Sequence, residues 1–494
     1  MSELPYAWTW ATIGEICAIN PRQFSEPIAD DELLSKVPMA AVQAETGKMD
    51  GTQIVRYADI KKKTLTPFQE GDVLFAKVTP CMENGKIALA TRLHGGRGVG
   101  STEFFVLRSR GNVDPRYMMY FLLQQGVRSE AERSMTGAVG LRRVPRPYLE
   151  NLKIPIPPMP EQRRITAAVE DHLSRLDAGL DGVDRAKRQV PVLWEALLRQ
   201  AVDGELSQVA DADAADYSTG QIKEARRKMA RNSRRPAAPA PISDYSLPAG
   251  WRLASLDEIS YASGYGTSTK CDYGGLGAPV LRIPNIRSGE IEFSDQKNAV
   301  DATLDLSRLF VTPGDLLFIR TNGSLNLLGR AAVVREASDT AFASYLIRYR
   351  LLSEVVIPDW VRLVVDSPKW RHYIMDHAAS SAGQYNVNLK VLGAMPIPIP
   401  PLEQQRRILE DLKSQQTLVA RFEVSTQQSI ERASSLREAV LRGAFSGKLV
   451  PQDSTDRPAS VLLERIQAKQ TAVRQGSRRR HKGAAAPSQE ELPL

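Results

Sequence analysis

Two pairs of polar loops contain the residue types in this chain that could do chemistry. Residues 77–86 and 137–143 form the first pair, and residues 320–330 and 380–388 form the second. Arginine can pair bidentately with guanine and asparagine or glutamine with adenine, while serine, threonine, lysine and glycine-rich backbone suit phosphate. Any one of these residues alone is more often an ordinary turn residue. Taken jointly and in duplicate, the loops favour nucleic-acid recognition.

The candidate DNA-binding residues are the polar and cationic side chains of these loops. They are Lys77, Thr79, Asn84, Lys86, Arg142 and Arg143 in the first pair and Arg320, Asn322, Ser324, Arg330, Gln384, Tyr385 and Asn386 in the second. The two loop pairs stand at matching places in two similar halves of the chain.

The chain has no motif that predicts an active site. No phosphate-binding Gly-x-x-x-x-Gly-Lys-[Ser/Thr] loop occurs, and Gly264-Tyr265-Gly266 lacks the third glycine of a dinucleotide site. His372 and His377 are spaced wrongly for two metal ligands on one helical face. Neither a Ser/His/Asp motif nor a nuclease carboxylate cluster stands out. We expect no catalytic residue, no metal and no cofactor bound by this chain.

The loops belong to an internal duplication with an offset of 243 residues. The repeated segments are a proline-rich strut that runs into a helix, a Gly-Asp turn that precedes a strand, and a helix end. They occupy residues 154–165 and 397–408, residues 71–75 and 314–318, and residues 193–206 and 436–449. Because all three keep one register, residues 4–206 and 247–449 are two copies of one unit. Such a chain is predicted to have pseudo-two-fold symmetry, as a covalent counterpart of a homodimer.

Each strut, Ile-Pro-Ile-Pro-Pro, is predicted to be extended, because proline fixes φ and keeps its predecessor out of the helical region. A long heptad pattern follows each strut, and it asks for a partner helix. The expected seam residues are Val169, Leu173, Leu176, Leu180, Val183, Val190, Trp194 and Leu197 in the first copy and Ile408, Leu412, Val419, Phe422, Ile430, Ala433, Leu436 and Val440 in the second. About 40 residues of helix would span roughly 60 Å.

Several residues interrupt this pattern. Pro191 is expected to kink the first helix or to split it in two. Gln416 and Thr426 stand where the second seam should be apolar. Gly204 and Gly447 fit as helix stops. Since neither helix is predicted to be stable alone, each is expected to be the partner of the other.

The segments before the struts have mixed patterns. Residues 73–75 and 103–107 are predicted to be strands, and residues 115–125 are predicted to form a helix that begins with proline and recurs at residues 358–365. The expected fold class is α+β, with two similar mixed α/β globular domains joined by two long antiparallel coiled-coil helices. The two halves of the internal repeat are then related by a pseudo-two-fold axis.

Charge and cysteine usage limit the partners and the compartment. The net charge is +8, but the excess lies in residues 223–235 and 465–482, so the globular parts need a local basic patch to touch nucleic acid. Such basic segments can equally be solvated helix ends. Cys17, Cys81 and Cys271 are scattered and are expected to be reduced. With no signal region and no long apolar stretch, we expect a cytoplasmic protein without a membrane segment.

These elements together resemble the DNA-specificity subunit of type I restriction–modification enzymes. The resemblance rests on the repeated Ile-Pro-Ile-Pro-Pro…Gln-Arg-Arg-Ile, the Gly-Asp turn before its strand, and the Leu-x-Glu-Ala helix end, and it spans Leu4 to Leu463. Together with the sequence patterns, it implies six successive regions. These are target recognition domain 1 (1–155), conserved helix 1 (156–206), a linker with a basic helical patch (207–246), target recognition domain 2 (247–398), conserved helix 2 (399–449) and a basic, partly disordered tail (450–494).

The resemblance also implies function and partners. Each globular domain would read one half of a split sequence in double-stranded DNA, and the helices would set the gap between the halves. The chain would do no chemistry itself. It would hold two methyltransferase subunits and also translocase/nuclease subunits, and S-adenosylmethionine, ATP and Mg²⁺ would be bound by those partners. The differing middles of the two loop pairs favour an asymmetric target.

Two other functions remain open from the sequence. A stand-alone architectural or regulatory DNA-binding protein of the same shape would bind tightly without any partner. An unrecognised nuclease or methyltransferase would turn over substrate as an isolated chain. The basic segments could contact either DNA or the methyltransferase, and the sequence does not choose between them.

Overall fold

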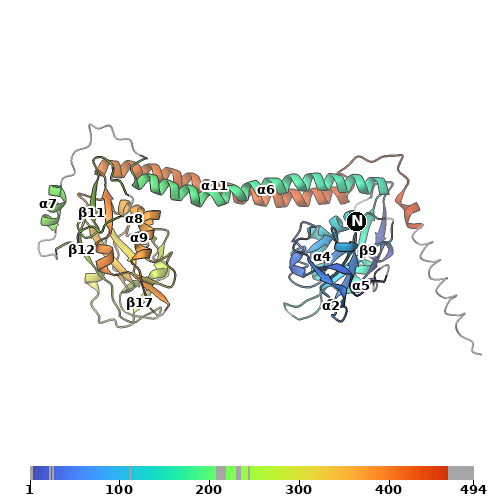
Figure 1. The fold of residues 1–494 in the computed structure, drawn as a ribbon, viewed down its shortest axis with the longest axis horizontal. Coiled ribbons are helices and arrows are strands. Elements are labelled where there is room, and N and C mark those ends of the chain that lie inside the picture. Colours follow the sequence, from blue (N-terminus) through green and yellow to red (C-terminus); the bar gives the residue numbers. More distant parts are fainter. Residues whose placement is uncertain are drawn as a thin grey trace, which may run out of the picture. The chain divides into compact units, whose positions relative to one another are not determined.

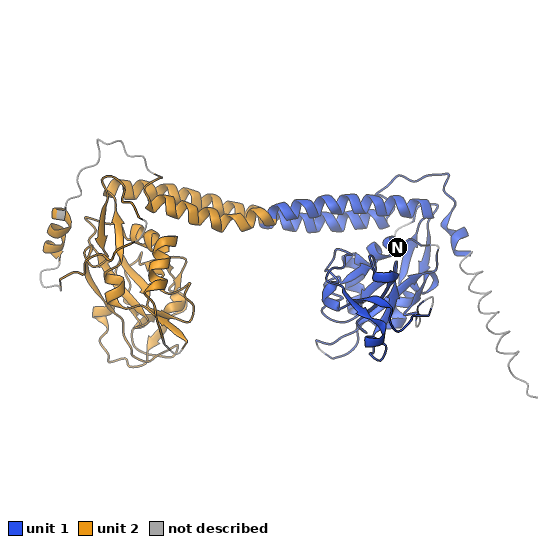
Figure 2. Cartoon of the chain, in the orientation of Figure 1, with its two compact units in different colours: residues 1–183, 427–494 blue, residues 184–426 orange. Residues whose placement is uncertain are grey.

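The computed structural model describes residues 4–21, 24, 27–111, 113–138, 140–206, 219–229, 235–242, 245–381 and 383–464. The chain separates into two compact units (Figure 2). Unit 1 comprises Met1–Val183 and Gln427–Leu494, and unit 2 comprises Asp184–Thr426. Each unit therefore combines one α/β domain with parts of both long helices.

The α/β domain of unit 1 contains two four-stranded sheets, ordered β2-β9-β6-β7 and β4-β3-β8-β5, and the pair β1-β10. Its strands are β1 (Thr9–Thr12), β2 (Cys17–Ile19), β3 (Leu33–Val37), β4 (Gln53–Arg56), β5 (Thr66–Gln69), β6 (Val73–Ala76), β7 (Ile87–Leu89), β8 (Arg97–Gly100), β9 (Phe104–Ser109) and β10 (Lys153–Ile156). Its short helices are α1 (Ile13–Ile16), α2 (Tyr57–Ile60), α3 (Pro115–Leu123), α4 (Gln125–Arg133) and α5 (Arg146–Asn151). The predicted strands at residues 73–75 and 103–107 are confirmed as β6 and β9, and the predicted helix at residues 115–125 is confirmed as α3.

The α/β domain of unit 2 contains a six-stranded sheet ordered β12-β22-β18-β20-β16-β15, a sheet ordered β13-β17-β14-β21, a sheet ordered β19-β24-β23, and the pair β11-β25. Its strands are β11 (Arg252–Ser255), β12 (Ser260–Tyr265), β13 (Cys271–Asp272), β14 (Pro279–Leu281), β15 (Ile286–Arg287), β16 (Glu290–Ile291), β17 (Lys297–Ala299), β18 (Asp315–Ile319), β19 (Thr321–Asn322), β20 (Ala331–Val333), β21 (Ala341–Phe342), β22 (Leu346–Leu351), β23 (Ala379–Ser381), β24 (Gln384–Asn386) and β25 (Pro396–Ile399). Its helices are α8 (Pro358–Asp366), α9 (Pro368–Asp376) and α10 (Leu389–Gly393), of which α8 and α9 lie side by side (Figure 1). Helix α8 packs on β18 and β20. The predicted second helix at residues 358–365 is confirmed as α8.

Both proline-rich struts are extended, as predicted. They form β10 and β25, which pair antiparallel with β1 and β11 in the same register, since Thr9 lies opposite Ile156 and Arg252 lies opposite Ile399. Both struts are buried, and their carbonyls accept bonds from aromatic side chains. In unit 1 the Tyr117 hydroxyl donates to Pro155 O (2.8 Å). In unit 2 the corresponding donor is the Trp360 indole, which donates to Pro398 O.

The strut and the following helix are joined by buried polar contacts that repeat in the two units. Gln162 accepts a bond from the Asp114 backbone N–H (2.8 Å) and donates to Pro157 O (2.9 Å). Gln405 makes the same two bonds in unit 2, at 2.9 and 2.8 Å. Because the glutamine is buried and both of its ends are satisfied, it fixes the helix on the domain.

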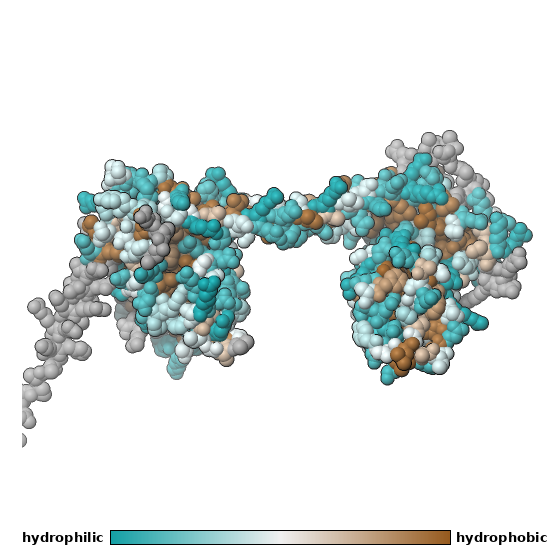
Figure 3. Space-filling model, turned by 180° about the vertical axis from the view of Figure 1, so that it is seen from behind, coloured by the Kyte–Doolittle hydropathy of each residue, from teal (hydrophilic) through white to brown (hydrophobic). Residues whose placement is uncertain are grey.

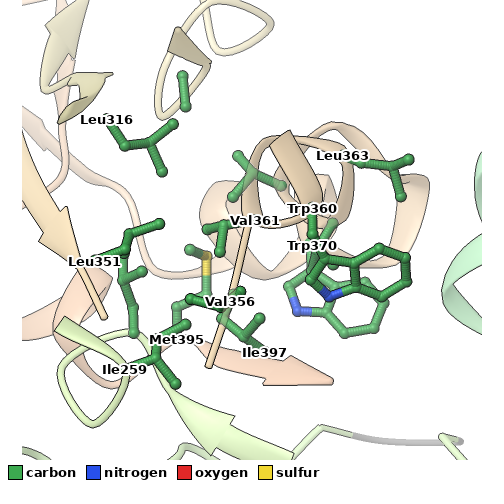
Figure 4. Close-up of a cluster of buried hydrophobic side chains, with 14 of the residues drawn as sticks. Ile259, Leu316, Leu351, Val356, Trp360, Val361, Leu363, Trp370, Met395 and Ile397 are labelled. Carbon is green, nitrogen blue, oxygen red and sulfur yellow. The ribbon is translucent and has the colours of Figure 1, made fainter. Parts of the chain in front are cut away.

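The core of unit 2 shows how its domain is closed around the strut. Side chains of α8, α9 and β25 converge, among them Trp360, Trp370 and Ile397, and the two tryptophans are the largest fully buried side chains (Figure 4). The indoles donate to the carbonyls of Pro398 (2.7 Å, from Trp360) and Pro396 (from Trp370). Buried tryptophan needs a hydrogen-bond acceptor, and the proline-rich strut supplies carbonyls that no strand on that side uses.

The long helices α6 (Met159–Val202) and α11 (Leu402–Phe445) pair within each unit. In unit 1 the core includes Ile165, Val169 and Leu173 from the start of α6 and Leu441, Ala444 and Phe445 from the end of α11. In unit 2 it includes Ile408 and Leu412 from the start of α11 and Leu198, Ala201 and Val202 from the end of α6. Start meets end in both units, so the helices are antiparallel. Exposed apolar residues on them are scattered (Figure 3).

Two expectations for the helices are corrected. α6 is not split at Pro191, which lies inside one helix and is exposed, so the pyrrolidine ring meets solvent while neighbouring Val190 and Trp194 stay partly buried. Leu436 is not in the seam, since it is 53% exposed and Leu441 is 2% exposed. The register changes because the last turns of α11 also pack on α3, where the Phe445 ring lies 4.9 Å from that of Tyr117.

Gly204 and Gly447 end their helices as predicted, with φ of 76° and 70°. A Cβ at Gly204 would collide with Pro248, and a Cβ at Gly447 would collide with Pro5. The end of each repeat's helix therefore meets the beginning of the other repeat's domain. Glycine is required here by both the left-handed backbone and the close approach.

The predicted basic linker helix is confirmed in part as α7 (Thr219–Met229). Ile222 and Ala225 are buried in unit 2, and Arg226 donates to the carbonyls of Asp257 and Ser260. Linker residues 207–218, 230–234 and 243–244, and the basic tail from residue 465 onward, lie outside the described residues. Among the helices that are described, none combines the length and the apolar character needed to cross a membrane.

Candidate nucleic-acid interface

The structure brings the two polar loops of the first pair together. Val78 and Arg143 form an antiparallel bridge, flanked by bonds from Thr79 N to Arg142 O (3.0 Å) and from Val144 N to Lys77 O (2.8 Å). The Thr79 hydroxyl also accepts a bond from Arg142 N (3.1 Å). Lys77, Thr79, Arg142 and Arg143 therefore lie on one short ladder.

The second pair forms the same ladder in the same register. Thr321 pairs with Asn386 and Asn322 with Tyr385, and Val387 N donates to Arg320 O (2.9 Å). The pairing of residue 321 with residue 386 corresponds to that of residues 78 and 143 in unit 1. The bond between residues 387 and 320 corresponds to that between residues 144 and 77, at the same offset of 243. The ladder is thus a duplicated structural feature whose side chains differ between the two units.

The side chains of the first ladder are held by neighbouring acids and carbonyls. Arg143 makes a bidentate ion pair with Glu103 (2.8 and 3.0 Å), and Arg142 lies 3.4 Å from Glu83. The hydrogen bond from Arg143 holds the pKa of Glu103 below its ordinary value. Lys77 Nζ donates to Thr102 O (2.7 Å). Both ion pairs are only partly buried, so a phosphate or a guanine edge can compete with the carboxylates for these guanidinium groups.

The other candidates of the first loop, Asn84 and Lys86, lie away from the ladder. Lys86 Nζ donates to Met39 O (3.1 Å), which turns the ammonium group toward its own domain. Asn84 is exposed at the middle of the loop. Of these two, Asn84 is the side chain presented to solvent.

The second ladder presents amides and a stacked guanidinium. Arg320 lies over the Tyr265 ring at 4.5 Å, and its Nε donates to Asn386 Oδ1 (3.3 Å). Gln384 is exposed and accepts a bond from the Thr321 hydroxyl (3.4 Å). Amide groups at such places can pair with adenine edges.

The remaining candidates of unit 2 are spread along the loop. Asn322 Oδ1 accepts a bond from Ser324 N (2.8 Å), which shapes the turn after the ladder. Tyr385 is half-buried and packs against the main core of unit 2. Arg330 donates to Asn326 O (2.6 Å) at the end of the loop, away from the ladder.

Sequence reasoning missed the aromatic and buried partners of these loops. Tyr345, which is 56% exposed, follows Ser344, whose carbonyl accepts a bond from Arg320 Nη1 (3.3 Å). Arg128 and Arg371 are buried beneath the loops. A comparison of the copies at the offset of 243 would have found the two arginines, since they align. The residues that the structure describes include no metal-type cluster of three or more His, Cys, Asp or Glu side chains.

Comparisons with known proteins agree with this architecture. The family model for the type I restriction modification DNA specificity domain matches residues 5–180. The EcoEI specificity subunit of Escherichia coli is 26% identical, and the match covers 89% of this chain and 83% of that protein. The StySPI specificity subunit of Salmonella potsdam is 22% identical, with 98% of this chain and 99% of that protein covered.

Solved structures show the same fold. A chain from a study of complex assembly and conformational transition of the type I R-M system superposes with a TM-score of 0.65 at 21% identity, covering 91% of this chain and all of that one (100%). The HsdS subunit from Thermoanaerobacter tengcongensis superposes with a TM-score of 0.58 at 20% identity, covering 90% of this chain and 98% of that one. The mixed α/β domains and the long antiparallel helices are therefore a known arrangement.

Proposed function

We propose that this chain, a member of the family of DNA-specificity subunits of type I restriction–modification enzymes, is the non-catalytic subunit that reads a bipartite, asymmetric DNA target. The observation that carries the proposal is the duplicated ladder. One backbone arrangement occurs in two domains, and it displays arginines in unit 1 and mainly amides in unit 2. Two ladders with the same backbone pairing but different side chains are suited to read two different half-sites.

The two units differ in the bases that their side chains are suited to read. Arg142 and Arg143 can pair with guanine edges, whereas Asn322, Gln384 and Asn386 can pair with adenine edges. Lys77, Thr79 and Ser324 suit phosphate, which fixes register without reading sequence. The domain boundaries that we assign are residues 1–155 and 247–398 for the two readers, 156–206 and 399–449 for the helices, and 207–246 and 450–494 for the linker and the tail.

The partners follow from the family. Two methyltransferase subunits would bind this chain and use S-adenosylmethionine, and translocase/nuclease subunits would add ATP and Mg²⁺ chemistry. Because the target is chromosomal or invading DNA and the cysteines are free, we place the complex in the cytoplasm. A stand-alone DNA-binding protein is the less favoured alternative, since eight curated relatives match and those named here are specificity subunits.

The proposal is tested by mapping the DNA protected by the complex of this chain with its methyltransferase subunits. We expect one bipartite sequence to be protected and methylated. Exchange of residues 247–395 for the corresponding domain of a relative should change one half-site and leave the other half-site and the gap unchanged. Equal binding to all duplexes at moderate salt, where non-specific contacts weaken, would refute it.

A further inference from the structure

Two buried arginines lie beneath the recognition loops at the repeat offset. Arg128 on α4 is 7% exposed and Arg371 on α9 is 8% exposed, and they stand 243 residues apart. Arginine is almost never buried without partners that satisfy its five donors. In each unit at least one of those partners is a backbone carbonyl of the loop that leads away from the ladder, while Nη1 of Arg371 has no hydrogen-bond partner among the described residues.

In unit 1 the guanidinium of Arg128 ties three segments together. Nη1 donates to Glu83 O (2.7 Å) in the middle of loop 77–86, Nη2 to Glu45 (2.5 Å), and Nε to Leu123 O (3.2 Å). Gly85 lies against the same guanidinium, so that an added Cβ would sit 3.0 Å from Nη1. The loop is therefore built around this side chain.

In unit 2 the guanidinium of Arg371 makes the corresponding contact. Nη2 donates to Leu325 O and to Asn326 O, both at 3.1 Å. Asn326 is the repeat counterpart of Glu83. Two loops that differ in side chains thus share one anchoring contact, in which a buried arginine on the helix below binds the same backbone carbonyl.

We propose that Arg128 and Arg371 are positioning residues for DNA recognition, each of which fixes one recognition loop so that its side chains meet the base edges in a single geometry. This inference rests on the proposed function. Neither arginine touches DNA, because both are buried beneath the loops. Bidentate readout depends on alignment, and a loop that is ordered before binding loses less entropy on contact.

The anchoring is local, so each arginine governs one half-site. Arg128 bonds only within unit 1, and the bonds of Arg371 join residues of unit 2. Loss of either guanidinium should let the loop beyond the ladder sample several conformations, while the backbone pairing of the ladder itself, which carries Lys77 and Thr79 in unit 1, stays in place. Discrimination between right and wrong bases then falls at one half-site, whereas binding that ignores sequence stays nearly constant.

The test uses the full complex with its methyltransferase subunits and measures affinity for the target and for duplexes substituted in one half-site. The variants are Arg128→Met, Arg371→Met and the two lysine substitutions, and the control is Arg133→Met, an exposed position on α4. A wrong base pair should cost wild type roughly five- to 100-fold in affinity, and Arg128→Met should reduce this to about threefold or less at the half-site of unit 1 alone. Arg371→Met should do the same at the other half-site, with lysine intermediate.

Hydrogen exchange of the loop amides supplies a readout that needs no DNA. Exchange should rise in residues 82–86 of the Arg128 variants and in residues 324–330 of the Arg371 variants, while the other unit stays unchanged. If a methionine variant does not fold, the lysine variant of the same arginine and the methionine variant in the other unit still test the inference. Unchanged discrimination in a folded variant, or equal loss at both half-sites, would overturn the inference. A wild-type complex without sequence preference would instead refute the proposed function.

Discussion

Glu161 and Gln404 occupy the same position in the two repeats, but only the former can ionise. Each accepts a bond of 3.0 Å from an indole, from Trp8 in unit 1 and from Trp251 in unit 2. Burial raises the pKa of Glu161 above its ordinary value, and the bonds from Trp8 and Gln452 oppose this only in part. The chain thus contains a carboxylate and its neutral counterpart in equivalent settings.

Glu161→Gln should stabilise unit 1 increasingly as pH rises. The folded-state pKa of this carboxyl lies above the unfolded value near 4.5. The folded protein therefore becomes less stable relative to the unfolded chain as pH rises from the unfolded pKa through the folded pKa, because the unfolded state ionises more readily. Urea unfolding between about pH 4 and 7 should show the advantage of the variant growing toward neutrality. The reverse change, Gln404→Glu, should introduce the same pH dependence into unit 2. Parallel pH profiles of wild type and variant would contradict this.

At the scale of elements, the C-terminal end of α11 packs against two other helices, α6 and α3. It pairs with α6, and it also carries Phe445 against Tyr117 and Phe121 of α3, at ring separations of 4.9 and 5.4 Å. A strict heptad serves only one partner. The register therefore moves so that Leu441 becomes buried and Leu436 is exposed.

This shift is tested by a matched pair of leucine substitutions on one helix. Leu441→Ala should lower the free energy of unfolding of unit 1 by about 2–5 kcal/mol, because it leaves a cavity in the core. Leu436→Ala, five residues earlier and 53% exposed, should change it by about 0.5 kcal/mol or less. Thermal or urea unfolding checks both values. Similar losses of unfolding free energy in the two variants would mean that Leu436 lies in the seam after all, as the heptad pattern predicted.

At the scale of the whole molecule, neither compact unit is one repeat. Unit 1 includes residues 427–449 of the second repeat, and unit 2 begins with residues 184–206 of the first. The contacts of Gly204 with Pro248 and of Gly447 with Pro5 repeat this exchange. Each α/β domain is therefore stabilised by helix from both copies of the repeat.

The proposed function makes these helices the spacer between half-sites. Four residues inserted after Val183 and four after Thr426 would lengthen both helices by about 6 Å while nearly keeping the packing face. At ~3.4 Å per base pair, the gap between the protected half-sites should grow by about two base pairs. Methylation mapping of the complex measures the gap. The same insertion placed in residues 210–215 is the control, and an unchanged gap in the helix variant would exclude the spacer role.

Much of the fold could be predicted from local signals, and the site only in part. The strut prolines, the heptads of α6 and the strand β6 act within a few residues, so their patterns are visible in the sequence. The candidate residues were chosen by chemical type, which does not reveal partners. Arg143 therefore looked available for DNA, although the fold places Glu103 beside it at 2.8 Å.

The sequence by itself determined the duplication, the extended struts and the pairing of long helices, because proline geometry and apolar periodicity are properties of the local chain. Only the tertiary structure decided that the loops of each pair share a ladder and that Arg128 and Arg371 anchor those loops from below. It also decided that each unit borrows helix from the other repeat. These features depend on residues far apart in the chain meeting in space, and neither composition nor periodicity encodes such distances.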